Sequence, residues 1–232
     1  MLHDLETAVS ACGFTLHGGF HPDVRDEMPM LPDGRKAATI ILIGSTGTDL
    51  WRHFQSDSPD KPDPLDRWTA QKLGPIAETF GAHAVFPFQS PFQPFQRWLQ
   101  RAETCHVSPL RLLIHPEYGL WHAIRGAMLF ADLLELPEVE KAHSPCKTCH
   151  AHPCMTSCPV NAFSAHGLDT TLCAAHLAST ERGACMSRGC LARRACPVGV
   201  SYQHQPEQAA FHMAALLATH QGAKLQTDAP AA

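Results

Sequence analysis

The sequence lacks several features that would assign the chain to a specialised class of protein. Its longest strongly apolar stretch, residues 38–44, is far shorter than the roughly 20 residues of a membrane-spanning helix. Its 18 lysine and arginine residues face 22 aspartate and glutamate residues, so no excess of positive charge favours a nucleic-acid backbone. Asp4 and Glu6 occupy positions where a secretory signal is basic. We therefore expect a cytoplasmic protein with neither a membrane nor a nucleic-acid partner.

Cysteine is scarce in most of the chain and concentrated in one region. Only Cys12 and Cys105 lie in the first 145 residues, and the other eight of the 10 cysteines lie within residues 146–196. Because the cytoplasm keeps thiols reduced, clustered cysteines there are expected to bind metal rather than form disulfides. The change in composition predicts a domain boundary within residues 137–145.

The first part of the chain combines helical and strand patterns, and 44% hydrophobic residues are enough for a buried core. Helices are predicted over residues 2–11, 45–55, 64–80 and 92–102, and strands over residues 38–44, 82–86, 110–114 and 121–130. After the cysteine-rich region, residues 205–220 are predicted to form a helix. The tail from Gly222 onward is expected to be flexible.

The eight clustered cysteines have the spacing of iron–sulfur proteins. They form two runs, Cys146-x2-Cys149-x4-Cys154-x3-Cys158-Pro159 and Cys185-x4-Cys190-x5-Cys196-Pro197, with Cys173 between them. Bacterial two-cluster ferredoxins use C-x2-C-x2-C-x3-C-P, in which the fourth cysteine binds the other cluster. Eight thiolates match two [4Fe–4S] clusters. Two structural zinc sites are the alternative, because C-x2-C also begins many zinc ribbons.

Residues 146–197, including the segment 168–173 and Gly189-Cys190, resemble the C-terminal ferredoxin region of epoxyqueuosine reductases. They resemble the cluster domain of reductive dehalogenases more loosely. The resemblance implies how the ligands divide between two clusters. One cluster would be bound by Cys146, Cys149, Cys154 and Cys196, and the other by Cys158, Cys173, Cys185 and Cys190.

Residues 114–126 resemble a segment shared by epoxyqueuosine reductases and MMACHC/CblC-type cobalamin-processing proteins. The pattern H-P-x-[FY]-G-G-W-F-A-I-R-G is matched with departures at Leu120 and His122. Both groups have a nitroreductase-like α/β domain that holds cobalamin. The resemblance implies that a corrinoid or a cosubstrate binds near His115, Tyr118, Gly119, His122 and Arg125. A salt bridge is the alternative role for Arg125.

The resemblance and the residue patterns together predict an α+β protein with three segments. Residues 1–140 would form a nitroreductase-like, CblC-like α/β domain, and residues 141–204 a small ferredoxin-like domain with two [4Fe–4S] clusters. Residues 205–232 would form a C-terminal helix and a flexible tail.

The predicted function is that of an iron–sulfur oxidoreductase related to cobalamin-dependent reductases. Electrons from a flavodoxin, a ferredoxin or a flavoprotein reductase would pass through both clusters to a cofactor, such as a corrinoid, or to a small-molecule substrate. A ferredoxin-type electron carrier without a corrinoid and a zinc-stabilised structural module are the alternatives. Residues 82–102 contain no Asp or Glu, although epoxyqueuosine reductases carry a proton-donating acid in such a segment. Reduction of epoxyqueuosine on tRNA is therefore disfavoured. Arg193-Arg194 is interpreted as a patch for an acidic electron donor or as a solvated turn.

Overall fold

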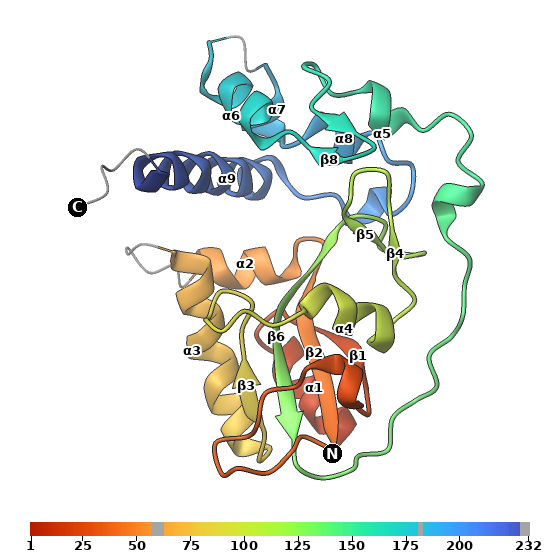
Figure 1. Cartoon of the computed structure of the whole chain (residues 1–232), viewed down its shortest axis with the longest axis vertical. Helices are drawn as coiled ribbons and strands as arrows, with labels where there is room; N and C mark the ends of the chain where they lie inside the picture. The colour runs from red at the N-terminus through yellow and green to blue at the C-terminus, as the bar shows by residue number, and fades with distance from the viewer. Residues whose placement is uncertain (57–62, 181–182, 228–232) are drawn as a thin grey trace. The chain divides into compact units, whose positions relative to one another are not determined.

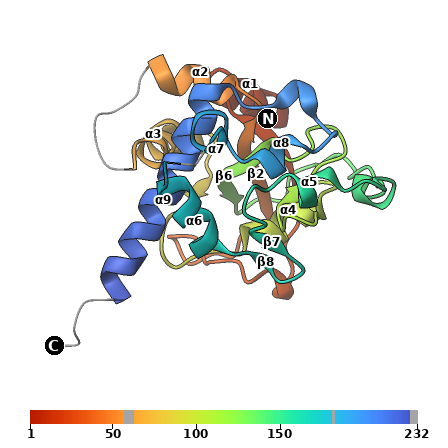
Figure 2. The ribbon, with the colours of Figure 1, turned by 90° about the horizontal axis from the view of Figure 1, so that it is seen from above.

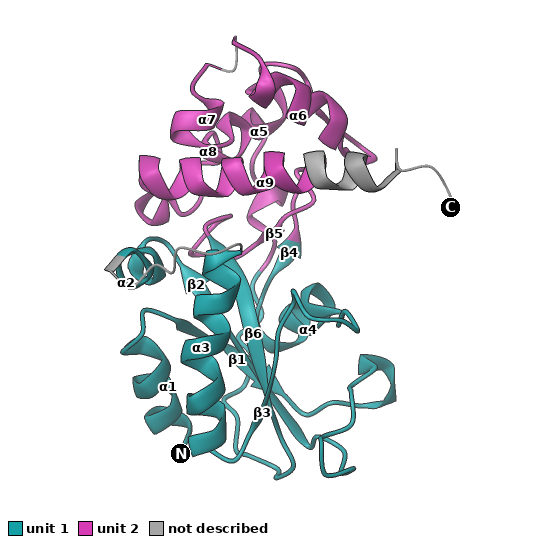
Figure 3. Ribbon diagram, turned by 90° about the vertical axis from the view of Figure 1, so that its left-hand side faces the viewer, with its two compact units in different colours: residues 1–106, 122–142 teal, residues 107–121, 143–232 magenta. Residues whose placement is uncertain are grey.

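The computed structural model describes residues 1–56, 63–180 and 183–227, the last seven by their backbone alone. The chain divides into two compact units (Figure 3). Unit 1 consists of residues 1–106 and 122–142, and unit 2 of residues 107–121 and 143–232. The segment 107–121 thus belongs with the cysteine-rich residues. The division into domains at residues 140 and 204 stays a prediction.

Unit 1 is built on an antiparallel sheet of four strands in the order β1-β2-β6-β3 (Figure 1). The strands are β1 (Thr15–Phe20), β2 (Thr39–Thr46), β6 (His122–Phe130) and β3 (His83–Val85). The two central strands pair from Thr39 opposite Phe130 to Thr46 opposite His122, with an irregularity between Ile43 and Gly44. The β-branched run at residues 39–43 is fully buried, because branched side chains pack well on a pleated surface covered on both faces.

Helices cover both faces of this sheet. Figure 3 shows α1 (Leu2–Ser10) and α3 (Pro64–Thr79) on one side and α4 (Phe95–Ala102) on the other. A further helix, α2 (Asp49–Ser56), follows β2, and a short 3₁₀ turn, η1, spans Val24–Asp26. The buried residues of α4 recur at intervals of three and four, as an amphipathic helix requires. They are Phe95, Trp98, Leu99 and Ala102.

Five sequence-based predictions for the elements need correction, the last of which concerns the C-terminal helix described below. The helix predicted over residues 45–55 starts only at Asp49, because residues 45 and 46 continue strand β2. Strand β1 was not predicted, because Gly18 and Gly19 interrupt its hydrophobic alternation. The strand predicted over residues 110–114 is reduced to β5 (Leu113–Ile114), since Arg111 has φ = 61° within a turn. Helix α4 starts at residue 95 rather than 92, with Pro94 as its N-cap.

Unit 2 consists of short elements around the cysteines. In chain order they are η2 (Pro145–Lys147), α5 (Pro153–Thr156), β7 (Phe163–Ser164), β8 (Gly167–Leu168), α6 (Thr170–Ala178), α7 (Cys185–Arg188), α8 (Leu191–Arg194), η3 (Val200–Tyr202) and α9 (Pro206–Thr227). Strand β5 pairs with β4 (His106–Val107). Figure 2 shows α6 and α7 beside α9, which contacts both.

The C-terminal helix is the fifth correction. Helix α9 continues to Thr227, five residues beyond the Gly222 at which the flexible tail was predicted to begin. The residues after Gly222 include Ala, Lys, Leu and Gln, which are good helix formers. The remainder of the predicted tail, residues 228–232, lies outside the described residues. Across the described ranges, no helix combines the length and the apolar character needed to cross a membrane.

Candidate metal centres

Four cysteines from distant parts of the sequence line one cavity of unit 2. This first cysteine group consists of Cys146, Cys149, Cys154 and Cys196. Apolar side chains, among them Ile114, Leu120 and Val198, form much of the remaining wall. The cavity and the space in front of it amount to about 350 Å³. The cysteines that the sequence resemblance assigns to one cluster therefore lie around a common space.

The other four clustered cysteines form a second cysteine group, Cys158, Cys173, Cys185 and Cys190. Cys185 is buried with Leu177 and Met213, and Cys173 and Cys190 pack against this core. Cys158 and Cys190 also pack against the core that contains Cys154 and Cys196. The two groups are therefore neighbours within unit 2, and Cys190 contacts both cores.

The electrostatic influences among the thiols follow the same division. Burial raises the pKa of Cys154, and the nearby Cys196, Cys146 and Cys149 raise it further. In the second group, burial raises the pKa of Cys173 to about 11, with further contributions from Cys190, Cys158 and Cys185.

Throughout the described part of the chain, each resolved influence of one clustered cysteine on another stays within one group. These influences connect the thiols in two sets of four, and the assignment of each set to one metal centre stays a prediction. Six of the thiols have a raised pKa, so they are protonated at neutral pH and release protons when a metal binds. They are those of Cys146, Cys154, Cys173, Cys185, Cys190 and Cys196.

Backbone amides are directed at several of the sulfur atoms. The N–H of Ala162 donates to Sγ of Cys158 at 3.3 Å. The N–H groups of Ala192 and Arg193 donate to Cys190 and lower the pKa of its thiol against the effect of burial. Similar donors reach Cys185 from Leu191 and Cys196 from Val198. Amide donors of this kind stabilise sulfur atoms that carry negative charge, as they do in iron–sulfur proteins.

The donor set and its surroundings fit an iron–sulfur cluster. Each group supplies four thiols, apolar walls and N–H donors, which are the features by which proteins hold and tune such clusters. Among the described residues, no three His, Cys, Asp or Glu side chains are close enough to hold a single metal ion.

The His-Pro motif of unit 2 is engaged in contacts within that unit. His115 accepts hydrogen bonds at Nδ1 from the N–H groups of Glu117 and Tyr118, at 3.1 and 3.2 Å. Its ring stacks on Tyr118 with 4.3 Å between the ring centroids. The backbones of His115 and Gly119 exchange two hydrogen bonds of 2.9 and 3.0 Å. These contacts form a closed turn.

This turn is packed against the backbone that follows the last cysteine. Gly119 has φ = 59°, and a Cβ atom there would lie 2.1 Å from the carbonyl oxygen of Val198. Gly199 has φ = 69°, and its Cβ would lie 2.3 Å from the carbonyl oxygen of Tyr118. The two backbone segments can approach this closely only because both positions are glycine. The predicted cofactor residue Gly119 therefore positions the segment after Cys196-Pro197.

Arg193 connects the same motif to helix α8. Its guanidinium group donates to the carbonyl oxygen of Leu120, with Nε at 3.0 Å, and stacks over the ring of Trp121 at 4.4 Å. Burial lowers the pKa of this guanidinium to about 10. The guanidinium group is thus half-buried and held by contacts within unit 2, whereas the sequence analysis considered a surface patch or a solvated turn. Arg194 makes only long hydrogen bonds of 3.4 Å to carbonyl oxygens.

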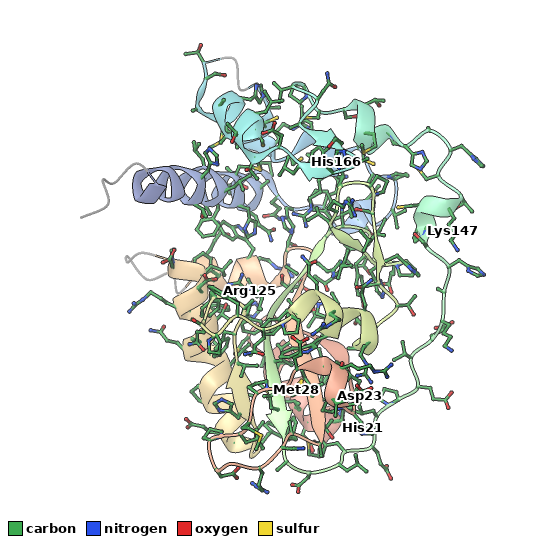
Figure 4. All side chains as sticks on the ribbon, viewed as in Figure 1. His21, Asp23, Met28, Arg125, Lys147 and His166 are labelled. Atoms are coloured by element: carbon green, nitrogen blue, oxygen red, sulfur yellow. The ribbon has the colours of Figure 1, made fainter. Side chains whose placement is uncertain are left out.

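The other two predicted cofactor residues lie in unit 1. Arg125, labelled in Figure 4, pairs with the carboxylate of Asp66 and reaches Oγ1 of Thr69 at 3.3 Å. This is the salt-bridge alternative considered for Arg125. His122 is buried at the start of β6, with its ring 5.8 Å from that of His17. Neither of the two cavities described for this chain, at residues 108–198 and 22–37, is lined by any of the five predicted cofactor residues.

The sequence analysis missed one buried polar pair in unit 1. Nδ1 of His17, a side chain with no exposed surface, lies 3.0 Å from a carboxylate oxygen of Glu103. Their separation of 86 residues left no local pattern to find. Strand β1, which contains His17, was also not predicted, so nothing in the sequence indicated that this histidine is buried.

Comparison with solved structures places the fold among those of epoxyqueuosine reductases. The chain is similar to the enzyme from Bacillus subtilis, with 14% identity and a TM-score of 0.52 over 90% of this chain and 68% of that chain. It is similar to the enzyme from Streptococcus thermophilus, with 15% identity, the same TM-score and 70% of that chain covered. A third structure, solved with an epoxyqueuosine-modified tRNA stem loop, gives 15% identity and a TM-score of 0.54, with 90% of this chain and 68% of that chain covered.

At sequence identities this low, the structural similarity is evidence of a shared fold alone. No protein-family model matches the chain, and no curated protein matches it. The fold expectation drawn from epoxyqueuosine reductases is confirmed at the level of a mixed helix and sheet protein.

Proposed function

We propose that the chain is an iron–sulfur oxidoreductase that holds two [4Fe–4S] clusters, one in each cysteine group. The observation that supports this most strongly is the convergence of the four cysteines of the first group on one cavity, beside a core in which Cys173, Cys185 and Cys190 pack together. Solved structures with a similar fold include those of epoxyqueuosine reductases. Their fold and this donor set favour redox chemistry over a purely structural role.

The residues of unit 2 would act on the clusters in three ways. The thiols of Cys146, Cys149, Cys154 and Cys196, and those of the second group, would bind iron as thiolates. The N–H groups of Ala162, Ala192 and other donors would stabilise negative charge on sulfur. The apolar walls limit access of water. When bound, the clusters supply one-electron transfer between a donor protein and the substrate.

We propose the acceptor and the donor from the sequence resemblance alone. A corrinoid or small-molecule acceptor and a flavodoxin, ferredoxin or flavoprotein donor are the classes it implies. The contacts of His115, Tyr118, Gly119 and Arg125 within the protein give no observation that favours a corrinoid over another acceptor.

An absorption spectrum of the anaerobically purified full chain tests the proposal. We expect a broad band near about 400 nm that dithionite bleaches, as thiolate-bound clusters show, and about eight iron atoms per chain. The double variant Cys12→Ser, Cys105→Ser, which leaves both groups intact, should keep the band. Stoichiometric zinc without the band would contradict the proposal and favour the structural module.

Titration with cob(II)alamin tests the corrinoid separately. A corrinoid retained through gel filtration, with a change in its spectrum, would support a cobalamin-dependent reductase. A chain that has both clusters and retains no corrinoid would be assigned to the electron carriers.

A further inference from the structure

A second cavity lies within unit 1, in the connection between strands β1 and β2. Residues 21–38, all of them described, form no helix or strand apart from the turn η1. A connection of this length without secondary structure is uncommon in a compact domain, and it is usually a functional loop or a disordered linker. This cavity, the unit 1 pocket, measures about 370 Å³. Its volume lies within the range of about 300–1,000 Å³ that is typical of small-molecule sites.

A buried carboxylate attaches this connection to helix α4. Asp26 is buried, and its carboxylate pairs with the guanidinium group of Arg101 and accepts the N–H of Asp23 at 2.7 Å. The indole N–H of Trp98 donates to the carbonyl oxygen of Asp26 at 2.9 Å. Since Arg101 and Trp98 both belong to α4, these charge-assisted and buried hydrogen bonds hold the wall of the pocket to the helix. The connection is therefore anchored as a binding loop is, and not as a linker.

The wall of the unit 1 pocket is largely apolar. Val24, Met28 and Met30 line it together with two prolines, and Figure 4 labels Met28 beside Asp23, which also lines the pocket. Val24 is 94% exposed and Met30 is 54% exposed. Methionine side chains adapt to irregular apolar shapes, and burial of such surface by a ligand stabilises the complex. The wall therefore suits the apolar body of a small molecule.

Three charged side chains line the pocket, and two of them are already paired. The carboxylate of Asp23 lies 2.7 Å from the guanidinium group of Arg25, and that of Glu27 lies 3.2 Å from the guanidinium group of Arg97. Lys36 is exposed, and no ion pair of the described residues includes it. The ammonium group of Lys36 is therefore the charge that is available to a ligand.

We propose that the unit 1 pocket binds a small amphipathic carboxylate. The carboxylate group would pair with the ammonium group of Lys36, and the apolar body would pack on Val24, Met28 and Met30. A cation would be repelled by Lys36 and would compete with two arginines for the paired acids. A single ammonium group suits a singly charged anion, whereas phosphate sites add backbone N–H or arginine donors. The pocket contains none of the clustered cysteines, so the proposal goes beyond the proposed function and is independent of it.

Isothermal titration calorimetry of the full chain with hexanoate, heptanoate and octanoate tests the apolar part of the site. Each added methylene should raise the association constant about fourfold, which is the gain expected from burial of one CH₂ group. Neutral 1-octanol should bind about fivefold more weakly than octanoate, because it lacks the charge that pairs with Lys36. An association constant that does not rise with chain length would overturn the proposal.

Two substitutions of Lys36 test the charged part of the site. Lys36→Met removes the charge and keeps an unbranched side chain, and it should weaken octanoate binding about fivefold while leaving 1-octanol binding unchanged. Lys36→Arg keeps the charge and should stay within about twofold of the wild type. Lys141→Met is the matched control, because Lys141 is an exposed lysine of unit 1 that does not line the pocket. Octanoate that binds Lys36→Met as tightly as the wild type would overturn the proposal.

Nuclear magnetic resonance of the full chain with labelled methionine methyl groups locates the ligand. We expect octanoate to shift the signals of Met28 and Met30, assigned through Met28→Leu and Met30→Leu. The signal of Met128, which is buried in β6, should not move. Binding that leaves Met28 and Met30 unshifted would overturn the proposal. An iron-loaded chain that binds no octanoate would also overturn it and leave the proposed function intact, and an iron-free chain that binds octanoate would do the reverse.

Discussion

The close approach of Gly119 to Val198 leads to a quantitative prediction for Gly119→Ala. The new Cβ would lie 2.1 Å from the carbonyl oxygen and 2.6 Å from the carbonyl carbon of Val198. Both are backbone atoms, so the turn has to move. The strain of an alanine at positive φ costs about 1–2 kcal/mol, and overpacking costs about 1–3 kcal/mol. We expect a loss of about 3 kcal/mol in the free energy of unfolding.

Thermal unfolding followed by circular dichroism would measure this loss. About 3 kcal/mol corresponds to a decrease in Tm of about 6–12 °C for a chain of this size. Because Val198 follows Cys196-Pro197, the displacement should also reach the first cysteine group. We expect the purified variant to contain about half of the wild-type iron, as the loss of one of two four-iron clusters requires.

Gly34→Ala is the control for backbone strain alone. Gly34 also has positive φ, at 82°, and a Cβ there would have no atom within 4 Å. Its strain is partly offset by the lower entropy of the unfolded chain, so we expect a loss of about 1 kcal/mol at most. A Gly119→Ala protein as stable as Gly34→Ala would show that the two backbones do not interlock as described.

Three further predictions concern the thiols and the buried polar groups. Cys173→Ala should halve the iron content measured by elemental analysis, while the control Cys12→Ala should leave it unchanged. A Cys173→Ala protein that retains all of its iron would contradict the assignment of Cys173 as a ligand. Burial, with Arg193 nearby, lowers the pKa of His204 from 6.5 to about 2. The unfolded chain then binds a proton between these pH values that the folded chain does not, so stability falls as the pH decreases below about 6.5, by up to about 1.4 kcal/mol per pH unit. His204→Phe should flatten this dependence in urea unfolding at pH 5 and pH 7, and an unchanged slope would rule out His204 as its source. Glu103→Gln replaces the carboxylate 3.0 Å from His17 and should cost about 1–3 kcal/mol, while Glu138→Gln, on an exposed residue, should leave the denaturation midpoint unchanged.

The spacing of the cysteines indicated iron–sulfur ligands, and their division between two clusters was implied by the resemblance to epoxyqueuosine reductases. Cys158 is followed by a proline, as in ferredoxins whose fourth cysteine binds the other cluster. In the structure, Cys158 packs against the core that contains Cys154 and Cys196. It also contributes to the raised pKa values of Cys173 and Cys185 in the second group. The ligand assignment itself stays a prediction until a cluster is observed.

The His-Pro motif could not be interpreted as well from the sequence, because its contacts are made with residues about 80 positions away. Tyr202 donates to the carboxylate of Glu117, and its ring packs on that of Tyr118. Contacts between residues so distant in the sequence produce no periodic pattern from which they could be predicted. Residues 115–121 of the motif make their contacts within unit 2, and the interpretation of the motif as a cofactor segment stays a prediction.

The second cysteine group lies along the chain between the third and fourth cysteines of the first group, and this has a consequence for biosynthesis. The first group starts at Cys146 and is completed only by Cys196, and the second is completed within that interval by Cys190. A ribosome therefore has to extend the chain by 50 residues after Cys146 before all four thiols of the first group exist. Neither site can be assembled from one half of the cysteine-rich region, so an early stop before residue 190 would leave up to six thiols exposed and both sites incomplete.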